Sequence, residues 1–147
     1  MADKSSEIRG FRTTFTIIGV LYIAMASSML LRGVGVLRDF GVPESAIAEP
    51  VLQDSFFFFY QCMAAMGALK VLFGHVTRTR ATQTVVASVF CVLSLLIAVR
   101  DLSTSDSRFG NHLYHGDKTL VFVGIGLALA CAFGWLAACG LQKRRQT

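Results

Sequence analysis

Four long apolar segments constrain this chain more than any other feature. Segments 15–31, 83–99 and 120–141 contain no Asp, Glu, Lys or Arg, and segment 55–74 contains one such residue, Lys70. The apolar core of a bilayer is about 30 Å thick and takes about 20 helical residues to cross. The sequence therefore predicts four transmembrane helices at these positions.

The composition argues against a soluble helical protein. The chain is 54% hydrophobic and 16% charged, whereas a soluble domain is typically about 25% charged. A helix in the core of a soluble protein keeps a polar outer face, but these segments are apolar on all sides. We expect an all-α integral membrane protein, with residues 1–147 forming one transmembrane domain and a left-handed four-helix bundle.

The first apolar segment has a second interpretation. A charged start precedes it, and Ala24-Met25-Ala26 resembles the small-residue cleavage site of a signal peptide. The apolar run is longer than a usual signal sequence and continues to Leu31. We therefore favour a retained span, with cleavage as the alternative.

The basic residues predict the orientation in the membrane. With four spans, both termini and the second connection share one side, and that side carries the larger share of the 14 Lys and Arg residues. The positive-inside rule then makes both termini cytoplasmic. Lys70 lies near the same end and is expected to extend its ammonium outward to the interface. The basic tails are interpreted as contacts to anionic lipid headgroups, and not to nucleic acid.

The acidic residues are distributed in the opposite way. Of the nine Asp and Glu residues, only Asp3 and Glu7 fall on the cytoplasmic side. The non-cytoplasmic face is therefore acidic, which indicates either a solvated rim or a site at the mouth of the bundle. In the connection "GVPESAIAEPV", residues 41 to 51, the sequence predicts one helical turn that covers this mouth.

Three acids are candidates for general acid–base catalysis. Asp54 and Asp101 lie at span boundaries and Glu49 lies close to one. A carboxyl held against an apolar wall can have its pKa raised and act as a general acid. The alternative is a structural role, in which Asp54 or Ser55 caps a helix and Arg100 pairs with a neighbouring acid.

The segment "RFGNHLYHGDK", residues 108 to 118, contains His112 and His115. Spaced three apart on a helix, they would share one face and could bind one metal ion. Gly110 and Gly116 make the segment prone to turns instead. It could be a metal site, an acid–base site that works with the nearby carboxylates, or a polar cap at the membrane surface. We assign no metal here and leave the cofactor unknown.

The segment "DSFFFFY", residues 54 to 60, opens the second span. Phe57, Tyr60 and Gln61 are candidates for binding a lipophilic substrate. The alternative is an aromatic-rich span at the interface, with Gln61 bonded to a neighbouring helix.

Small residues predict which helix faces pack together, because close approach drives association in lipid. The predicted contact residues are Gly126, Ala130, Gly134 and Ala138 in the fourth span, Tyr60, Ala64 and Ala68 in the second, and Ala24 and Ser28 in the first. The same faces could form a homo-oligomer or bind a partner membrane protein. The four cysteines all lie in the spans and predict no disulfide framework.

The chain resembles the DoxX-like small four-helix membrane proteins. The similarity is carried by "GVPESA" after the first span, "DSFFFFYQCMAAMGALKVLFG" opening the second and "LIAVRDLS" closing the third. It implies a helical bundle and a membrane location, and it carries over no catalytic residue.

Two functions follow from these patterns. The first is a membrane protein that binds a lipophilic small molecule at the acidic mouth, and that could catalyse isomerisation, cyclisation or an assisted oxidation. Its candidate catalytic residues are Asp54, Asp101, Glu49, His112 and His115. The second is a non-catalytic membrane subunit or adaptor that packs against partner helices. The sequence leaves open whether the protein is an enzyme.

Overall fold

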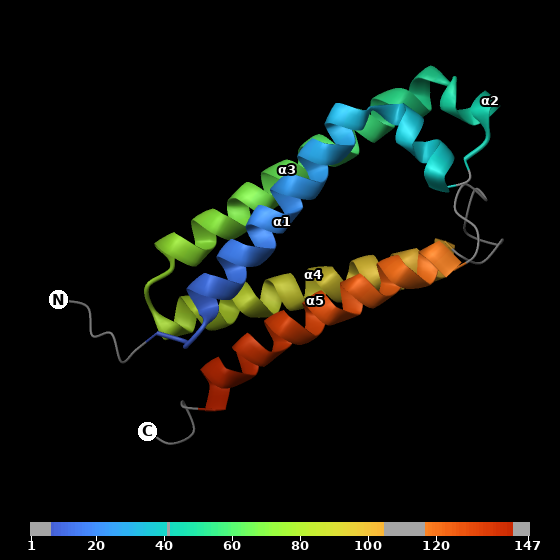
Figure 1. The fold of residues 1–147 in the computed structure, drawn as a ribbon. Coiled ribbons are helices and arrows are strands. Elements are labelled where there is room, and N and C mark those ends of the chain that lie inside the picture. The colour runs from blue at the N-terminus through green and yellow to red at the C-terminus, as the bar shows by residue number, and fades with distance from the viewer. Residues whose placement is uncertain (1–6, 41, 105–116, 143–147) are drawn as a thin grey trace.

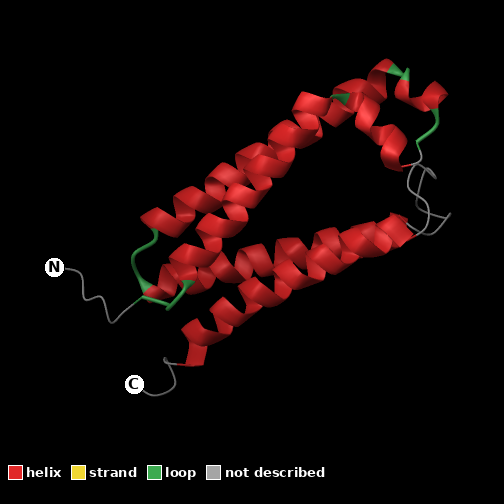
Figure 2. Cartoon of the chain, in the orientation of Figure 1, coloured by secondary structure: helices red, strands yellow, loops and turns green. Residues whose placement is uncertain are grey.

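The computed structural model describes residues 7–40, 42–104 and 117–142, and these residues form helices joined by short connections (Figures 1 and 2). In chain order the elements are α1 (Phe11–Arg32), the 3₁₀ helix η2 (Val34–Phe40), α2 (Glu44–Ile47), α3 (Pro50–Val76), α4 (Arg80–Thr104) and α5 (Asp117–Gln142). Figure 2 shows no strand among the described residues.

Four of these helices are long and apolar enough to cross a membrane. Their apolar stretches contain 22 residues in α1, 27 in α3, 24 in α4 and 23 in α5. At about 1.5 Å per residue each covers the roughly 30 Å of a bilayer core. The predicted all-helical class is confirmed, and each of the four predicted spans lies within a helix of sufficient length and apolar composition, which extends beyond the predicted segment.

Local sequence explains where the helices begin and end. Gly33 ends α1 with a φ of 69°, and its N–H donates to the carbonyl oxygen of Met29 at 3.0 Å. Glycine adopts this left-handed conformation without steric cost. α3 begins at Pro50, whose fixed φ suits a first helical position. The prediction that Asp54 or Ser55 caps α3 is wrong, because both lie inside the helix.

The long helices are arranged as two antiparallel pairs, α1 with α3 and α4 with α5 (Figure 1). Glycines allow the closest approach within each pair. A Cβ atom added to Gly19 would lie 2.6 Å from the carbonyl oxygen of Gly67. A Cβ atom on Gly126 would lie 2.9 Å from the Cβ of Ala98. Backbone-to-backbone packing of this kind is how helices associate in lipid.

The predicted packing face is largely correct for α5, where Gly126, Ala130 and Gly134 are covered and Ala138 is exposed, and it is partly wrong elsewhere. Gly126 of α5 packs against α4, as expected. On α1, however, the predicted contacts Ala24 and Ser28 are exposed. The contact between α1 and α3 is made instead by Gly19 and Gly67, which the small-residue stripes did not include.

The two pairs meet at one end of the molecule, called here the narrow end. Phe15 of α1, Phe90 of α4 and Phe133 of α5 form its core, with ring centroids 5.0 to 5.5 Å apart. The start of α1, the end of α5 and the connection between α3 and α4 also lie at this end (Figure 1). The first long helix therefore begins, and the last one ends, at the same end of the fold.

A buried glutamine adds polar contacts at the narrow end. The Ile8 N–H donates to Oε1 of Gln83 at 2.7 Å, and Nε2 of Gln83 donates to the carbonyl oxygen of Thr77 at 3.1 Å. Gln83 thereby joins the segment before α1 to the connection between α3 and α4.

The opposite end is called here the wide end, because the two pairs diverge towards it (Figure 1). Here η2 and α2 pack onto α3 through a second core, made of Val36, Leu37, Val42, Ile47 and Phe56. The predicted helical turn in the connection is confirmed by α2. The arrangement is more open than the closed four-helix bundle that the sequence predicts.

Candidate functional site

One face of α1 and one face of α4 are in contact at the aromatic core of the narrow end and diverge beyond it. Residues three and four apart share one face of a helix, so Phe15, Ile18, Tyr22 and Met25 form a single stripe along α1. Phe15 is 0% exposed, whereas Met25 is 43% exposed. The protein therefore covers the start of this stripe and leaves its continuation uncovered.

The facing stripe on α4 behaves in the same way. It runs through Ala87, Phe90, Ser94 and Ile97, and exposure is 6% at both Phe90 and Ser94 and reaches 48% at Ile97. Phe90 is in ring contact with Phe15, with centroids 5.4 Å apart. The two stripes thus start from one shared contact, and their uncovered parts at Met25 and Ile97 are called here the open faces.

An aromatic contact connects the two pairs again at the wide end. The ring of Phe40, the last residue of η2, lies 6.2 Å from the ring of Phe122 on α5, centroid to centroid. The open faces therefore lie between two aromatic contacts, one at each end of the molecule.

Lys70 of α3 lies between the covered parts of the two stripes. Its Nζ lies 3.8 Å from the ring centroid of Tyr22 and 4.9 Å from that of Phe90. The residue is only 3% exposed. The expectation that its ammonium extends outward to the interface is wrong, because Lys70 points inward between α1 and α4.

The surroundings of Lys70 offset only part of the cost of burying it. A desolvated cation–π contact contributes about 2 kcal/mol, whereas removing an ammonium from water costs several kcal/mol in a real protein, by order of magnitude. Among the described residues no carboxylate lies within ion-pair distance of Lys70. Sequence reasoning missed this site, although a lone charge inside an apolar span is itself a signal of function.

The predicted catalytic acids are placed on different parts of the fold. Asp54 is exposed in the second turn of α3, and Glu49 is exposed directly before that helix. Asp101 is half-buried near the end of α4, with its Oδ1 3.6 Å from Nη1 of Arg100. The predicted pairing of Arg100 is thereby confirmed. The start of α3 and the end of α4 lie apart at the wide end, so Asp54 and Asp101 are not brought together (Figure 1).

The two histidines, His112 and His115, lie outside the described residues. Within the parts of the chain that the structure describes, no group of three or more His, Cys, Asp or Glu side chains could hold a metal ion. The four cysteines, all in the described helices, are free.

The predicted substrate-binding residues differ in their surroundings. Phe57 and Gln61 are exposed on α3, whereas Tyr60 is half-buried. Tyr60 packs edge-on against Phe56, with centroids 4.7 Å apart. Phe56 is the member of the Phe run that enters the core of the wide end.

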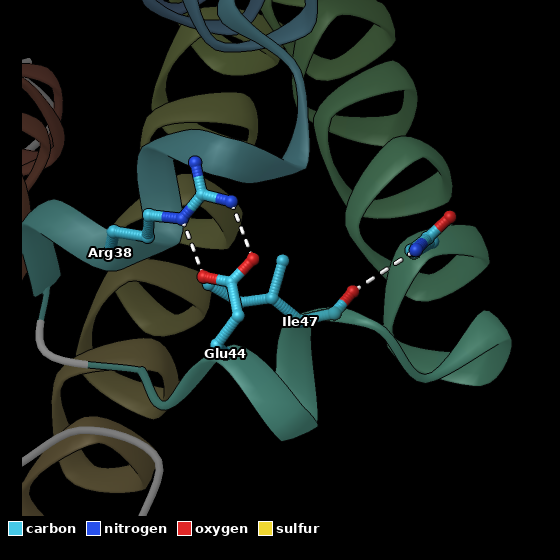
Figure 3. A network of polar contacts seen from close by, with 4 residues as sticks. Arg38, Glu44 and Ile47 are labelled. Carbon is cyan, nitrogen blue, oxygen red and sulfur yellow. Dashed lines mark hydrogen bonds and ion pairs between the residues drawn. The ribbon is translucent and has the colours of Figure 1, made fainter.

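An ion pair holds η2 against α2 at the wide end. Figure 3 shows two guanidinium nitrogens of Arg38, Nε and Nη2, donating to the carboxylate of Glu44, with Nε–Oε2 and Nη2–Oε1 distances of 2.6 and 2.5 Å. These hydrogen bonds, more than the charge attraction, hold the pKa of the Glu44 carboxyl below its ordinary value. They raise the pKa of the Arg38 guanidinium. Nε2 of Gln53 also donates to the carbonyl oxygen of Ile47 at 3.0 Å, which fixes α2 to α3.

Comparison of the chain with protein-family models, curated proteins and solved structures finds no match.

Proposed function

We propose that this chain is a multi-pass membrane protein, with both termini cytoplasmic, that binds a lipophilic small molecule between its two helix pairs. The observation that carries the proposal is the rise in exposure along two stripes that start from one contact, from Phe15 to Met25 and from Phe90 to Ile97. The DoxX-like resemblance of the sequence is consistent with the membrane location.

Lateral entry from the bilayer fits the arrangement of the open faces. They are bounded by the aromatic core at the narrow end and by the contact between Phe40 and Phe122 at the wide end. Between these limits the side chains offer dispersion contacts and few polar groups, which is the usual lining of a small-molecule site. An apolar molecule already dissolved in the membrane would reach them without crossing water.

Acid–base chemistry on the bound molecule remains part of the proposal. Asp101 is the best placed of the described acids, because it is half-buried at the wide end of α4. Asp54 and Glu49 are more exposed. His112 and His115, which lie outside the described residues, are proposed as acid–base residues from the sequence alone. The alternative of a non-catalytic subunit is less favoured, because Gly126 is used within the α4–α5 pair and not offered to a partner.

Native mass spectrometry of the chain released from lipid nanodiscs tests the proposal, with bound small molecules and metals both scored. We expect a stoichiometric apolar adduct. Ile97→Trp fills an open face and should reduce adduct occupancy at least tenfold. Leu96→Trp is the matched control, because Leu96 lies on an outer stripe with Val85, Val89 and Val92 that is exposed along its whole length.

Two results would contradict the proposal. A chain without any adduct would show that no small molecule is bound. An equal loss of adduct occupancy in Ile97→Trp and Leu96→Trp would show that the molecule does not bind between the pairs. A stable complex with another protein and no small molecule would favour the subunit.

A further inference from the structure

Lys70 is a buried cation without an anionic partner in the described part of the chain. The described ion pairs involve other residues. Asp54, on the same helix, is about 24 Å away at about 1.5 Å per residue. Glu7 is exposed before α1, outside the span. An anion that balances Lys70 would therefore come from outside these residues.

The contacts of Lys70 place this cation on the stripes that lead to the open faces. Tyr22 and Phe90, whose rings flank its Nζ at 3.8 and 4.9 Å, belong to the two stripes that lead to those faces. Tyr22 directly precedes Met25 on the α1 stripe, and Phe90 lies two stripe positions before Ile97 on α4. A long molecule lying along the open faces would thus reach the ammonium with its end.

We propose that Lys70 binds the carboxylate head of a single-chain lipophilic acid whose hydrocarbon tail lies along the open faces of α1 and α4. This inference rests on the proposed function and names the charge of its ligand. The carboxylate neutralises the lone ammonium, and the rings of Tyr22 and Phe90 hold that ammonium in place. A neutral ligand would leave the charge uncompensated in an apolar environment.

A carboxylate suits this site better than a phospholipid headgroup. A single lysine supplies one positive charge, which one carboxylate balances, whereas a phosphate monoester such as the headgroup of phosphatidic acid carries about −1.5 to −2 charges at pH 7. Lys70 is the single charged residue in the apolar segment 55–74. Phe90, whose ring centroid lies 4.9 Å from Nζ, packs in turn with Phe15 and Phe133 in the aromatic core.

Photolabelling of the full chain in nanodiscs of zwitterionic lipid tests the inference. The probes are a palmitic acid that carries a diazirine in its chain and the corresponding fatty alcohol. We expect the acid to label the wild-type chain at least tenfold more than the alcohol does. Lys70→Gln should reduce acid labelling to the level of the alcohol and leave alcohol labelling unchanged. Leu69→Gln, on an exposed position of the same turn, should label like the wild type.

The possible outcomes separate the two proposals. Equal labelling by acid and alcohol, with both reduced by Ile97→Trp, overturns the role of Lys70 and leaves the proposed function standing. Labelling by neither probe, together with a bare chain in the mass spectrum, overturns both. Displacement of the acid probe by phosphatidic acid tenfold better than by palmitate overturns the carboxylate assignment.

A competition on the wild-type chain keeps the test decisive if Lys70→Gln does not fold. Palmitate and methyl palmitate share the same tail and differ in charge. Displacement of the acid probe by palmitate alone supports the inference, and equal displacement by the ester overturns it.

Discussion

The backbone N–H of Ile8 donates to the side-chain oxygen of Gln83, 2.7 Å away and 75 positions along the chain. This bond connects the segment before α1 to the first turn of α4, at the end where both helix pairs meet. Because Gln83 is buried, neither partner can turn to water when the bond is broken. The loss of this hydrogen bond should therefore lower the free energy of unfolding of the protein.

Gln83→Leu should destabilise the protein by about 2 kcal/mol, because it leaves the Ile8 N–H and the Thr77 carbonyl without their partner. Unfolding by SDS in mixed micelles, followed by far-UV circular dichroism, measures the change. Gln61→Leu is the control, since Gln61 is exposed on α3. Equal stability of the two variants would show that the buried bonds contribute nothing.

Gly67→Ala should destabilise the protein by about 1–3 kcal/mol, the usual cost of overpacking. Its Cβ would lie 2.7 Å from the carbonyl oxygen of Gly19, so the α1 and α3 backbones would have to separate. Gly124→Ala provides the matched control, because a Cβ there meets nothing within 4 Å. The same SDS titration applies, and a loss in Gly124→Ala as large as in Gly67→Ala would contradict the packing argument.

Phe15→Ala should cost about 3 kcal/mol, a typical value for removing a buried phenylalanine. Phe15 contacts Phe11, Phe90 and Phe133 and is fully buried. Spin labels on α1 and α4 should also report a longer distance between the pairs in this variant. Phe58→Ala, at an exposed position, should change neither stability nor distance. An unchanged distance in Phe15→Ala would mean that the aromatic core does not set the angle between the pairs.

The contact between η2 and α2 should depend on pH. Because the pKa of Glu44 lies below its ordinary value in the folded protein, the pairing with Arg38 stabilises the wide end at pH values above that ordinary value. The stabilisation is lost as the pH falls through the lowered pKa. A carbon-13 NMR titration of the Glu44 carboxyl measures this value directly.

Two variants of Arg38 complete that experiment. Arg38→Gln should return the Glu44 pKa to its ordinary value, and Arg38→Lys should return it part of the way, because lysine keeps the charge and loses the two-pronged geometry. A Glu44 pKa that stays lowered in Arg38→Gln would show that another group causes the shift.

The sequence predicts the four long apolar helices well, because the length and apolar composition of a helix are properties of one segment of the chain. It predicts helix contacts less well. Small residues recur on more than one face of α1, and the choice of Gly19 over Ala24 depends on where α3 has its own glycine. That information lies in another segment of the chain, nearly 50 positions away.

Lys70 illustrates the same limit. Its position near the end of a span suggests an outward-pointing side chain, which is the common behaviour of lysine at a membrane interface. The inward orientation depends on Tyr22 and Phe90, two rings contributed by two other helices. The contact of the Lys70 ammonium with these two rings is therefore seen only when the arrangement of all three helices is known.

The divergence of the two helix pairs has a consequence for the membrane as well as for a ligand. A protein that is narrow at one end and wide at the other occupies unequal areas of the two leaflets. Such a wedge favours a bilayer that curves away from its wide end. The local curvature and lateral pressure of the membrane would then bias the angle between the pairs, and with it the access of lipid molecules to the open faces.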